Sequence, residues 1–155
     1  MSERPPYRLP RDVVPEHYSL VFTPDLDRAS FEGEAAVDVE VRTRVSEIVL
    51  NAAELEITEA SLEAGGPGIG SDGKMLDATV TYRPEYEQAA IILPAPVEPG
   101  RWKLRLSFSG KLNDLLRGFY RSRWRAPDGS EAWIATTQFE STDARRAFPC
   151  WDEPD

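Results

Sequence analysis

Hydrophobic and polar side chains alternate along much of the chain. Between residues 31 and 43, apolar side chains fill the odd positions from Ala35 to Val41, and charged side chains fill most of the even ones. Residues 102–108 alternate as cleanly. A period of two predicts a β-strand with one buried face and one solvated face.

Shorter segments carry the same signal and predict further strands, at residues 18–23, 47–51, 55–63, 78–82, 89–93, 119–124 and 132–138. Turn-forming glycine, proline and aspartate residues separate them. Asp128 and Gly129 lie between the last two segments and predict a hairpin. About nine closely spaced strands with almost no helical periodicity predict an all-β fold, an antiparallel, curved β-sandwich.

The pattern changes after Gln138. Residues 141–143 are of the capping type, helix formers follow, and Pro149 comes next, so one or two helical turns are predicted near the C-terminus. No repeat or linker divides the chain, and residues 1–155 are expected to form a single domain. Residues 65–73 are expected to be a flexible turn, because their glycines do not connect a strand to a helix as a phosphate-binding loop requires.

The residue counts restrict the chemistry. The 155 residues include one histidine, His17, and one cysteine, Cys150. A conventional zinc site needs more of these ligands, so we expect this chain to bind no metal. We interpret His17 as a structural or surface residue and Cys150 as a small buried hydrophobe. Self-contained hydrolytic chemistry is therefore not expected, and no residue is assigned a catalytic role.

The charge restricts the partners. The formal net charge of −9 has the wrong sign for a general nucleic-acid binder, and the acidic residues lie singly along the expected strands. No apolar run reaches the ~18 residues of a membrane span. The N-terminus lacks a signal core and a single cysteine forms no disulfide framework, so we expect no membrane partner and a cytoplasmic location.

Charged residues in the last third of the chain have structural interpretations. We interpret one set of carboxylates as helix caps or salt-bridge partners of Arg145 and Arg146: Asp143, Asp152 and Glu153. Four arginines share one parity of a strand-like segment, and we interpret them as a solvated face or an interface with an acidic neighbour: Arg117, Arg121, Arg123 and Arg125.

Gln138 and Glu140 differ from these residues in position. They flank Phe139 at the end of a predicted strand, so in extended geometry both would project to one side and Phe139 to the other. A carboxylate beside a carboxamide suits recognition of a cationic amine, because the carboxylate supplies charge and the amide oxygen a second acceptor.

The C-terminal run TTQFESTDARRAFPCWDEP, residues 136–154, closely resembles a signature of the aminopeptidase N family of zinc metallopeptidases, particularly its puromycin-sensitive-like members. Four earlier segments resemble the family's landmarks in the same order: RLPRDVVPEHYSL (8–20), FEG (31–33), IVLNAAELEI (48–57) and LNDLLRGFYRS (112–122). The resemblance covers essentially the whole chain.

The resemblance implies an N-terminal β-domain packed on a thermolysin-like catalytic domain. It implies that Glu140 binds the free α-amino group of a peptide substrate and that Gln138 lines the first side-chain pocket. The sequence has neither H-E-x-x-H nor the family's Gly-Ala-Met-Glu-Asn-type segment. The zinc implied for the full-length enzyme is therefore expected outside this chain, and the stop at Asp155 is interpreted as a domain boundary.

Two other functions remain open. A stand-alone binding or scaffold module could have kept the sandwich without the catalytic part. A carbohydrate- or partner-binding sandwich would need an exposed aromatic patch, whereas we expect Trp102, Trp124 and Trp133 to face the core. If a catalytic domain normally covers part of the surface, the domain alone is also expected to self-associate there.

Overall fold

The computed structural model describes residues 8–64 and 75–153, and it is built almost entirely from antiparallel strands. The strands are β1 (Val13–Asp25), β2 (Ser30–Val41), β3 (Val45–Asn51), β4 (Leu55–Ala64), β5 (Met75–Asp77), β6 (Thr79–Arg83), β7 (Gln88–Val97), β8 (Gly100–Lys111), β9 (Gly118–Arg125) and β10 (Glu131–Gln138). Two short 3-10 turns are η1 (Pro84–Tyr86) and η2 (Ala144–Arg146). The predicted all-β class is confirmed, and every predicted strand overlaps an observed one.

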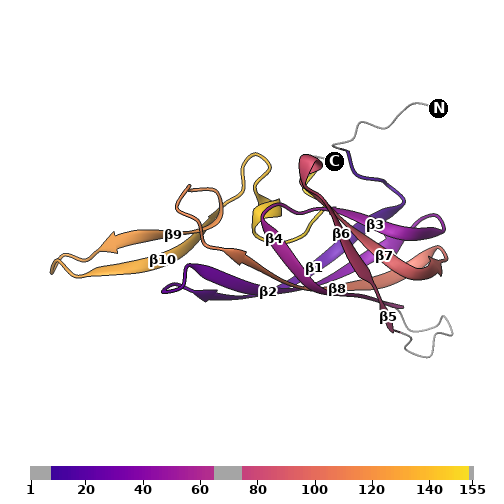
Figure 1. Cartoon of the computed structure of the whole chain (residues 1–155), viewed down its shortest axis with the longest axis horizontal. Coiled ribbons are helices and arrows are strands. Elements are labelled where there is room, and N and C mark those ends of the chain that lie inside the picture. The colour runs from indigo at the N-terminus through magenta and orange to yellow at the C-terminus, as the bar shows by residue number, and fades with distance from the viewer. Residues whose placement is uncertain (1–7, 65–74, 154–155) are drawn as a thin grey trace.

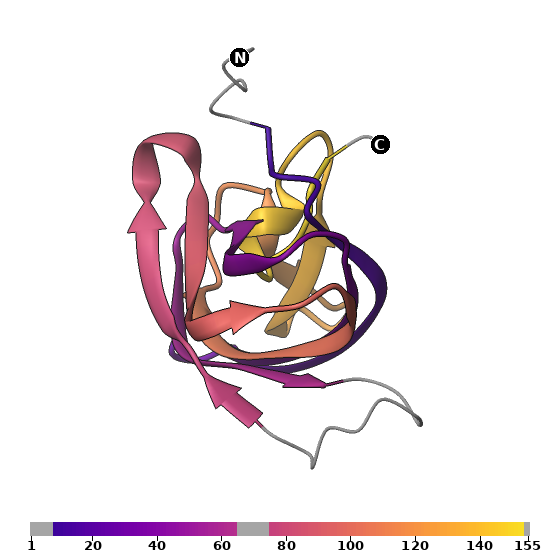
Figure 2. The same ribbon diagram turned by 90° about the vertical axis from the view of Figure 1, so that its right-hand side faces the viewer.

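The strands form two facing sheets and a hairpin (Figure 1). One sheet has the order β1-β2-β8-β4-β5, the other has the order β3-β7-β6, and β9 pairs only with β10. Figure 2 shows how strongly the sheets curve around the space between them. The predicted turn at residues 65–73 lies outside the described residues, and β5 is a short strand that the sequence pattern did not predict.

The core lies between the two sheets. Val37 and Val39 of β2 and Leu104 of β8 meet Leu50 of β3 and Ile91 of β7, and all five side chains are fully buried. Burying an aliphatic side chain of this size contributes ~1.5–3 kcal/mol to folding. The alternation read from the sequence therefore corresponds to the face of each strand that points into the sandwich.

Strand β4 departs from strict alternation. Leu55 and Ile57 are buried, and the register against β8 then shifts between Ile57 and Glu59, so that Ala60 and Leu62 face the core instead of the odd-numbered positions. An extra residue in one strand of an antiparallel pair is a β-bulge, which bends the strand and increases its twist. The bulge accounts for part of the curvature of the larger sheet.

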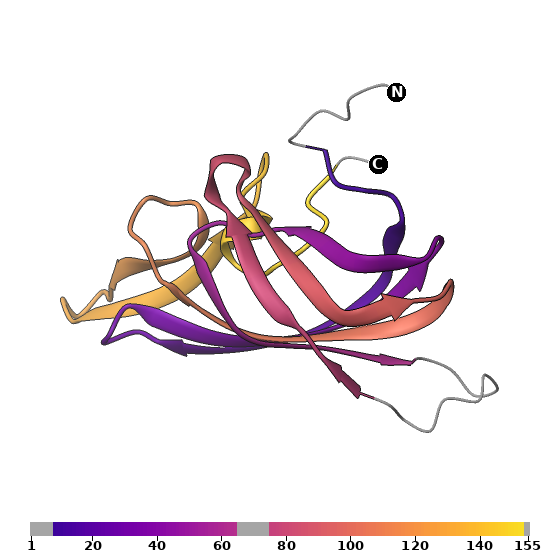
Figure 3. The same ribbon diagram turned by 45° about the vertical axis from the view of Figure 1, so that its right-hand side comes forward.

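The β9–β10 hairpin extends away from the sandwich along the long axis of the molecule (Figures 1 and 3). Its turn is closed by a hydrogen bond from the Ala126 N–H to the Ser130 carbonyl, 2.8 Å, and Gly129 takes the left-handed conformation with φ of 83°. The Asp128 carboxylate accepts hydrogen bonds from the Ser130 hydroxyl and N–H, which lower its pKa. The predicted hairpin is confirmed.

The expectation that the tryptophans face the core was wrong for Trp124, which is 50% exposed on the hairpin, and for Trp133, which does not pack against the core. Trp133 is half-buried, and the guanidinium groups of Arg121 and Arg123 lie 4.1 and 5.1 Å from its ring centroid. Trp102 packs at the margin of the core and donates to the Glu98 carbonyl. Trp124 is exposed because no second sheet covers the outer part of the hairpin within the described chain.

Candidate functional site

Gln138 is the last residue of β10 and pairs with Gly118, the first residue of β9. Its side chain is exposed, as is that of Glu140. Between them, Phe139 packs edge-on against Phe148, with ring centroids 6.0 Å apart, at the margin of the core. The strand ends at Gln138, and Glu140 lies in the following turn, so the extended geometry assumed from the sequence does not continue to Glu140.

The segment after β10 folds back on itself. The Asp143 N–H donates to the Phe139 carbonyl at 2.9 Å, and η2 begins at the next residue. Beyond η2, Asn51 exchanges two backbone hydrogen bonds with Cys150, at 2.8 and 3.0 Å, which fix the segment to the end of β3. The predicted helical turn is confirmed as a single 3-10 turn, although Asp143 makes no side-chain cap.

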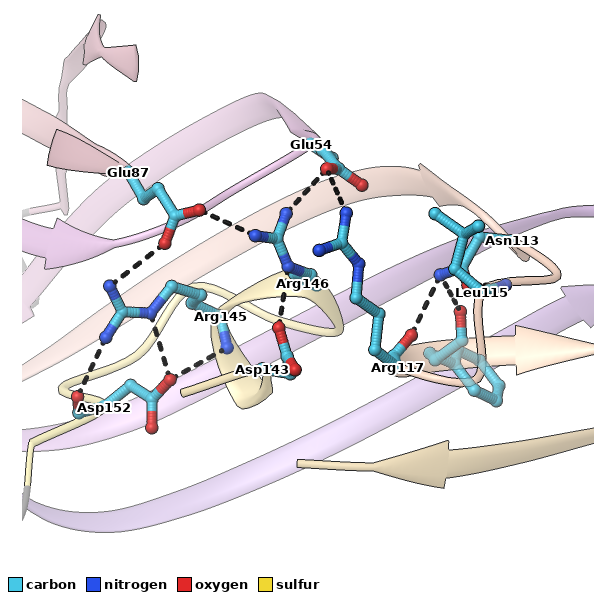
Figure 4. Close-up of polar contacts among 10 residues, drawn as sticks. Glu54, Glu87, Asn113, Leu115, Arg117, Asp143, Arg145, Arg146 and Asp152 are labelled. Atoms are coloured by element: carbon cyan, nitrogen blue, oxygen red, sulfur yellow. Dashed lines mark hydrogen bonds and ion pairs between the residues drawn. The ribbon is translucent and has the colours of Figure 1, made fainter. Parts of the chain in front are cut away.

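An ion-pair network, which we call the arginine cluster, joins this segment to the sandwich (Figure 4). It consists of Arg145 and Arg146 with the carboxylates of Glu54, Glu87, Asp143 and Asp152. Glu87 bridges the two arginines, with one oxygen 2.6 Å from Arg146 and the other 3.4 Å from Arg145. The shared Glu87 carboxylate therefore binds both guanidinium groups to the β6–β7 connection.

Arg146 uses each of its three nitrogens for a different carboxylate. Nε donates to Asp143 at 2.8 Å, one terminal nitrogen to Glu54 at 2.6 Å and the other to Glu87 at 2.6 Å. Its side chain is 11% exposed. Burial acts to lower the pKa of Arg146, but the hydrogen bond to Asp143 and the charges of Glu54 and Glu87 raise it overall, so the guanidinium stays charged.

Arg145 holds the far end of the same segment. Its Nε lies 3.1 Å from the Asp152 carboxylate, a terminal nitrogen donates to the Asp152 carbonyl at 3.2 Å, and its own carbonyl accepts from the Ala53 N–H at 2.9 Å. The salt bridges expected for Asp143 and Asp152 are therefore confirmed. The one expected for Glu153 was wrong: Glu153 pairs with Arg8 at 3.6 Å and accepts from the Leu9 N–H, because it lies beyond the reach of the cluster.

The sequence analysis did not identify Glu54 and Glu87 as members of the cluster. Both are non-glycine residues in the left-handed region, with φ of 59° and 54°. This conformation is uncommon for such residues. Both precede strands in tight connections, and no periodic pattern marks them. The only available signal was their position just before two apolar runs.

The arginines of the hairpin are paired within the chain. Arg121 donates to the Leu26 carbonyl at 2.6 Å, Arg123 and Arg125 pair with Glu131, and Arg117 pairs with Glu54. The exposed side chains of Arg123 and Arg125 fit the expected solvated face, whereas Arg121 is partly buried.

Three other groups could serve as nucleophiles, bases or ligands: His17, Cys150 and Tyr18. His17 is exposed, with a 3.5 Å contact to Ser19. Cys150 is buried, as expected, and burial raises the pKa of its thiol. Burial also raises the pKa of Tyr18, whose hydroxyl oxygen accepts from the Trp151 N–H. Cys150 and Tyr18 are therefore protonated at neutral pH.

Neither a group of possible metal ligands nor a described groove lies at Gln138 and Glu140. Within residues 8–64 and 75–153, no group of three or more His, Cys, Asp or Glu side chains could hold a metal ion. Four surface grooves of this part of the chain, of up to about 1040 Å³, are lined by other residues. In the same part of the chain, no helix is long and apolar enough to cross a membrane.

Comparison with known proteins gives one consistent result. The family model of the peptidase M1 N-terminal domain matches residues 14–155. Aminopeptidase M1 of Arabidopsis thaliana and puromycin-sensitive aminopeptidase of Caenorhabditis elegans are each 40% identical to the chain over 95% of its length, and aminopeptidase M1-D of Oryza sativa subsp. japonica is 42% identical over 95%. The chain spans only 15–16% of the length of these relatives.

Proposed function

The chain belongs to the peptidase M1 family as its N-terminal domain, and from that premise we propose that it serves a zinc-dependent aminopeptidase by binding the free amino end of the peptide substrate. Glu140 accepts the α-ammonium group in this proposal, and Gln138 contacts the first side chain. The parent reaction is hydrolysis of the N-terminal peptide bond. The chain contributes recognition and no catalytic residue.

The observation that carries the proposal is an exposed carboxylate next to an exposed carboxamide on an anchored segment. Phe139 is held against Phe148, so the backbone between Gln138 and Glu140 has a fixed attachment to the core. No hydrogen bond within the described residues engages the side chain of either residue. A carboxylate without an internal partner can accept hydrogen bonds from an ammonium group, and such charge-assisted bonds are strong and set position.

Within the described residues, no group of three or more His, Cys, Asp or Glu side chains could hold a metal ion, and a zinc site needs three or four such ligands. We therefore propose that the metal and the catalytic groups are held by a catalytic domain outside this sequence, and we derive no step through them. A separate catalytic domain agrees with the small share of the relatives' length that the chain spans.

The hairpin supplies a surface for that catalytic domain. Alternation along β10 places Ile134 on the same face as Gln138, and the pairing of Trp124 with Ala132 adds Trp124 to this face. Ile134 is 45% exposed and Trp124 50%. We propose that the catalytic domain packs here, so that Gln138 and Glu140 face the substrate cleft. In the domain alone, the same patch would favour self-association.

A stand-alone binding module is the second candidate, and exposed Trp124 and Ile134 favour it because an apolar patch binds partners without any catalysis. The two functions predict different DNA downstream of the coding sequence at the genomic locus. An open reading frame with H-E-x-x-H immediately downstream agrees with the aminopeptidase, whereas a genuine stop codon without such a frame nearby agrees with the module.

The test of the proposed function is steady-state kinetics of the full-length enzyme on an aminoacyl substrate with a free amine. Glu140→Ala should lower kcat/KM. The corresponding loss of transition-state stabilisation should be roughly 1.5–3 kcal/mol, the size of a charge-assisted hydrogen bond. Glu59 of β4 is a matched control, because it is also an exposed glutamate with no ion pair inside the described chain, and Glu59→Ala should leave the kinetics unchanged. Wild-type kinetics for Glu140→Ala would sink the assignment.

We also propose a cytoplasmic location, on the ground that the only cysteine is a buried free thiol. One relative, from Bos taurus, is named endoplasmic reticulum aminopeptidase 2 and is 38% identical. Cell fractionation separates the two compartments: recovery in the organelle fraction instead of the cytosol would contradict the proposal.

A further inference from the structure

Arg146 connects three separate parts of the chain. Glu54 comes from the β3–β4 connection, Glu87 from the β6–β7 connection, and Asp143 from the turn after Glu140. Figure 4 shows the guanidinium group of Arg146 at the centre of these carboxylates. Loss of this one side chain would remove three ion pairs at once and leave the contacts of Arg145 as the remaining side-chain link to these connections.

Arg146 also lies against the base of the hairpin. Gly118 adopts φ of 65°, and a Cβ atom at this position would lie 2.7 Å from the Cβ atom of Arg146. Gly118 is the register partner of Gln138. The strand partner of Gln138 is therefore the residue that lies close to Arg146.

Glu140 lies in a turn between Phe139 and Asp143. Phe139 precedes it and packs on Phe148, and Asp143 comes after it and donates its N–H to the Phe139 carbonyl. The Asp143 side chain is in turn held by Arg146 Nε at 2.8 Å. The turn containing Glu140 is thus closed by a hydrogen bond whose donor residue is fixed by Arg146.

We infer that Arg146 is a positioning residue, which sets the geometry of Gln138 and Glu140 toward the substrate amine without touching the substrate itself. This inference rests on the proposed function. An arginine suits the role because its planar group offers donors in fixed directions to three acceptors, whereas a lysine ammonium is a compact charge on a flexible stem.

The test is a double-mutant cycle of Arg146 and Glu140 in the full-length enzyme, with a free-amine aminoacyl substrate. Arg146→Ala should raise KM about five- to tenfold and leave kcat within about twofold, because residues coupled through one hydrogen-bond network or backbone shift interact by this order of magnitude. In a Glu140→Ala background, the same substitution should change KM less than about twofold. Arg146→Lys should fall between wild type and Arg146→Ala.

Arg105→Ala is the control for the loss of an arginine ion pair. It removes a surface arginine that pairs with Glu63 at 3.2 Å on the larger sheet, and it should leave KM unchanged. Gly118→Ala tests the contact with Arg146 from the hairpin side, and it should raise KM as Arg146→Ala does.

A second measurement uses the 155-residue chain itself. Hydrogen exchange of the Asp143 amide, which is bonded to the Phe139 carbonyl, should accelerate at least about tenfold in Arg146→Ala, while the amide of Leu104 in the core keeps its protection.

The outcomes separate the two proposals. If Glu140→Ala alone leaves KM unchanged, the proposed function fails and this inference fails with it. If Glu140→Ala raises KM but Arg146→Ala has the same effect in both backgrounds, the positioning role is overturned and the proposed function stands. Unchanged exchange of the Asp143 amide in Arg146→Ala would also overturn the positioning role.

Discussion

The sandwich and the C-terminal part of the chain, residues 118–153, are held in place by different combinations of contacts. In the sandwich, fully buried aliphatic side chains of facing sheets pack together. In the C-terminal part, Phe119 and Ala147 join the same core, and the arginine cluster adds ion pairs at its edge. The candidate site lies in the second region, where an exposed turn is positioned both by the packing of Phe139 on Phe148 and by the ion pair of Asp143 with Arg146.

This difference matters for function because a binding residue must be exposed and still be fixed. A buried strand is fixed but inaccessible, and a free loop is accessible but mobile. An exposed turn closed by ion pairs to a rigid sandwich meets both needs. Substitutions in the two regions should therefore have effects of different size and kind.

The largest effect is expected in the core of the sandwich. Leu104 is fully buried in β8, and Leu104→Ala should cost about 2–5 kcal/mol of unfolding free energy, because it removes buried methyl groups and leaves a cavity. Urea denaturation monitored by tryptophan fluorescence measures this cost. A loss below ~1 kcal/mol would mean that the facing sheets are not the main source of stability.

The next largest effect is expected where η2 meets the hairpin. Gly118→Ala should cost about 2–3 kcal/mol, because the new Cβ atom would overlap Arg146 and the residue would keep φ of 65°. Gly129→Ala is the matched control: φ is 83°, but nothing lies within 4 Å of the new atom, so about 1 kcal/mol is expected. Equal costs for the two variants in thermal unfolding would contradict the close contact.

The unfolding free energy should depend on pH because of a residue at the junction of the two regions, where Cys150 is buried next to Asn51. Burial raises the pKa of the thiol, so the unfolded chain releases this proton at lower pH than the folded chain. The contribution of the protonated thiol to the unfolding free energy should be fully present below about pH 8.5. Above this pH, the unfolding free energy should fall by up to ~1.4 kcal/mol per pH unit.

Chemical denaturation at several pH values between about 7 and 10 measures this slope. Cys150→Ala should flatten the slope up to about pH 10, where Tyr18, also largely buried, begins to contribute in the same direction. A wild-type slope in Cys150→Ala would show that the thiol is not the source.

The smallest effect is expected on the hairpin surface. Ile134→Ala should change the stability of the 155-residue chain by less than ~0.5 kcal/mol, because this side chain is 45% exposed and outside the core. In a full-length enzyme, the same substitution should cost more if the catalytic domain covers this face. An equal, small effect in both proteins would argue against the proposed docking surface.

The sequence predicted the sandwich well and the candidate site only in part. Strand positions follow from a period of two, which depends on neighbouring residues and is visible in any one segment. The bulge in β4 was missed because it changes the register between two strands, which no single segment shows. Exposed Trp124 was missed because its environment depends on whether another sheet covers the hairpin.

The residues that support the candidate site were harder to predict than its strands. Gln138 and Glu140 are proposed from residue type and family resemblance. Glu54 and Glu87 lie 92 and 59 residues from Arg146 in the sequence, and their role arises only when the two connections meet at η2. Ion pairs of this separation carry no local pattern.

Glu140 is proposed to recognise the free amine of the substrate. The most direct test is the inhibition constant of a dipeptide amide, with a free or an N-acetylated amino end, for the full-length enzyme and for Glu140→Ala. We predict that the wild type prefers the free amine by at least about tenfold and that Glu140→Ala loses most of this preference. Retention of the full preference in Glu140→Ala would contradict the account.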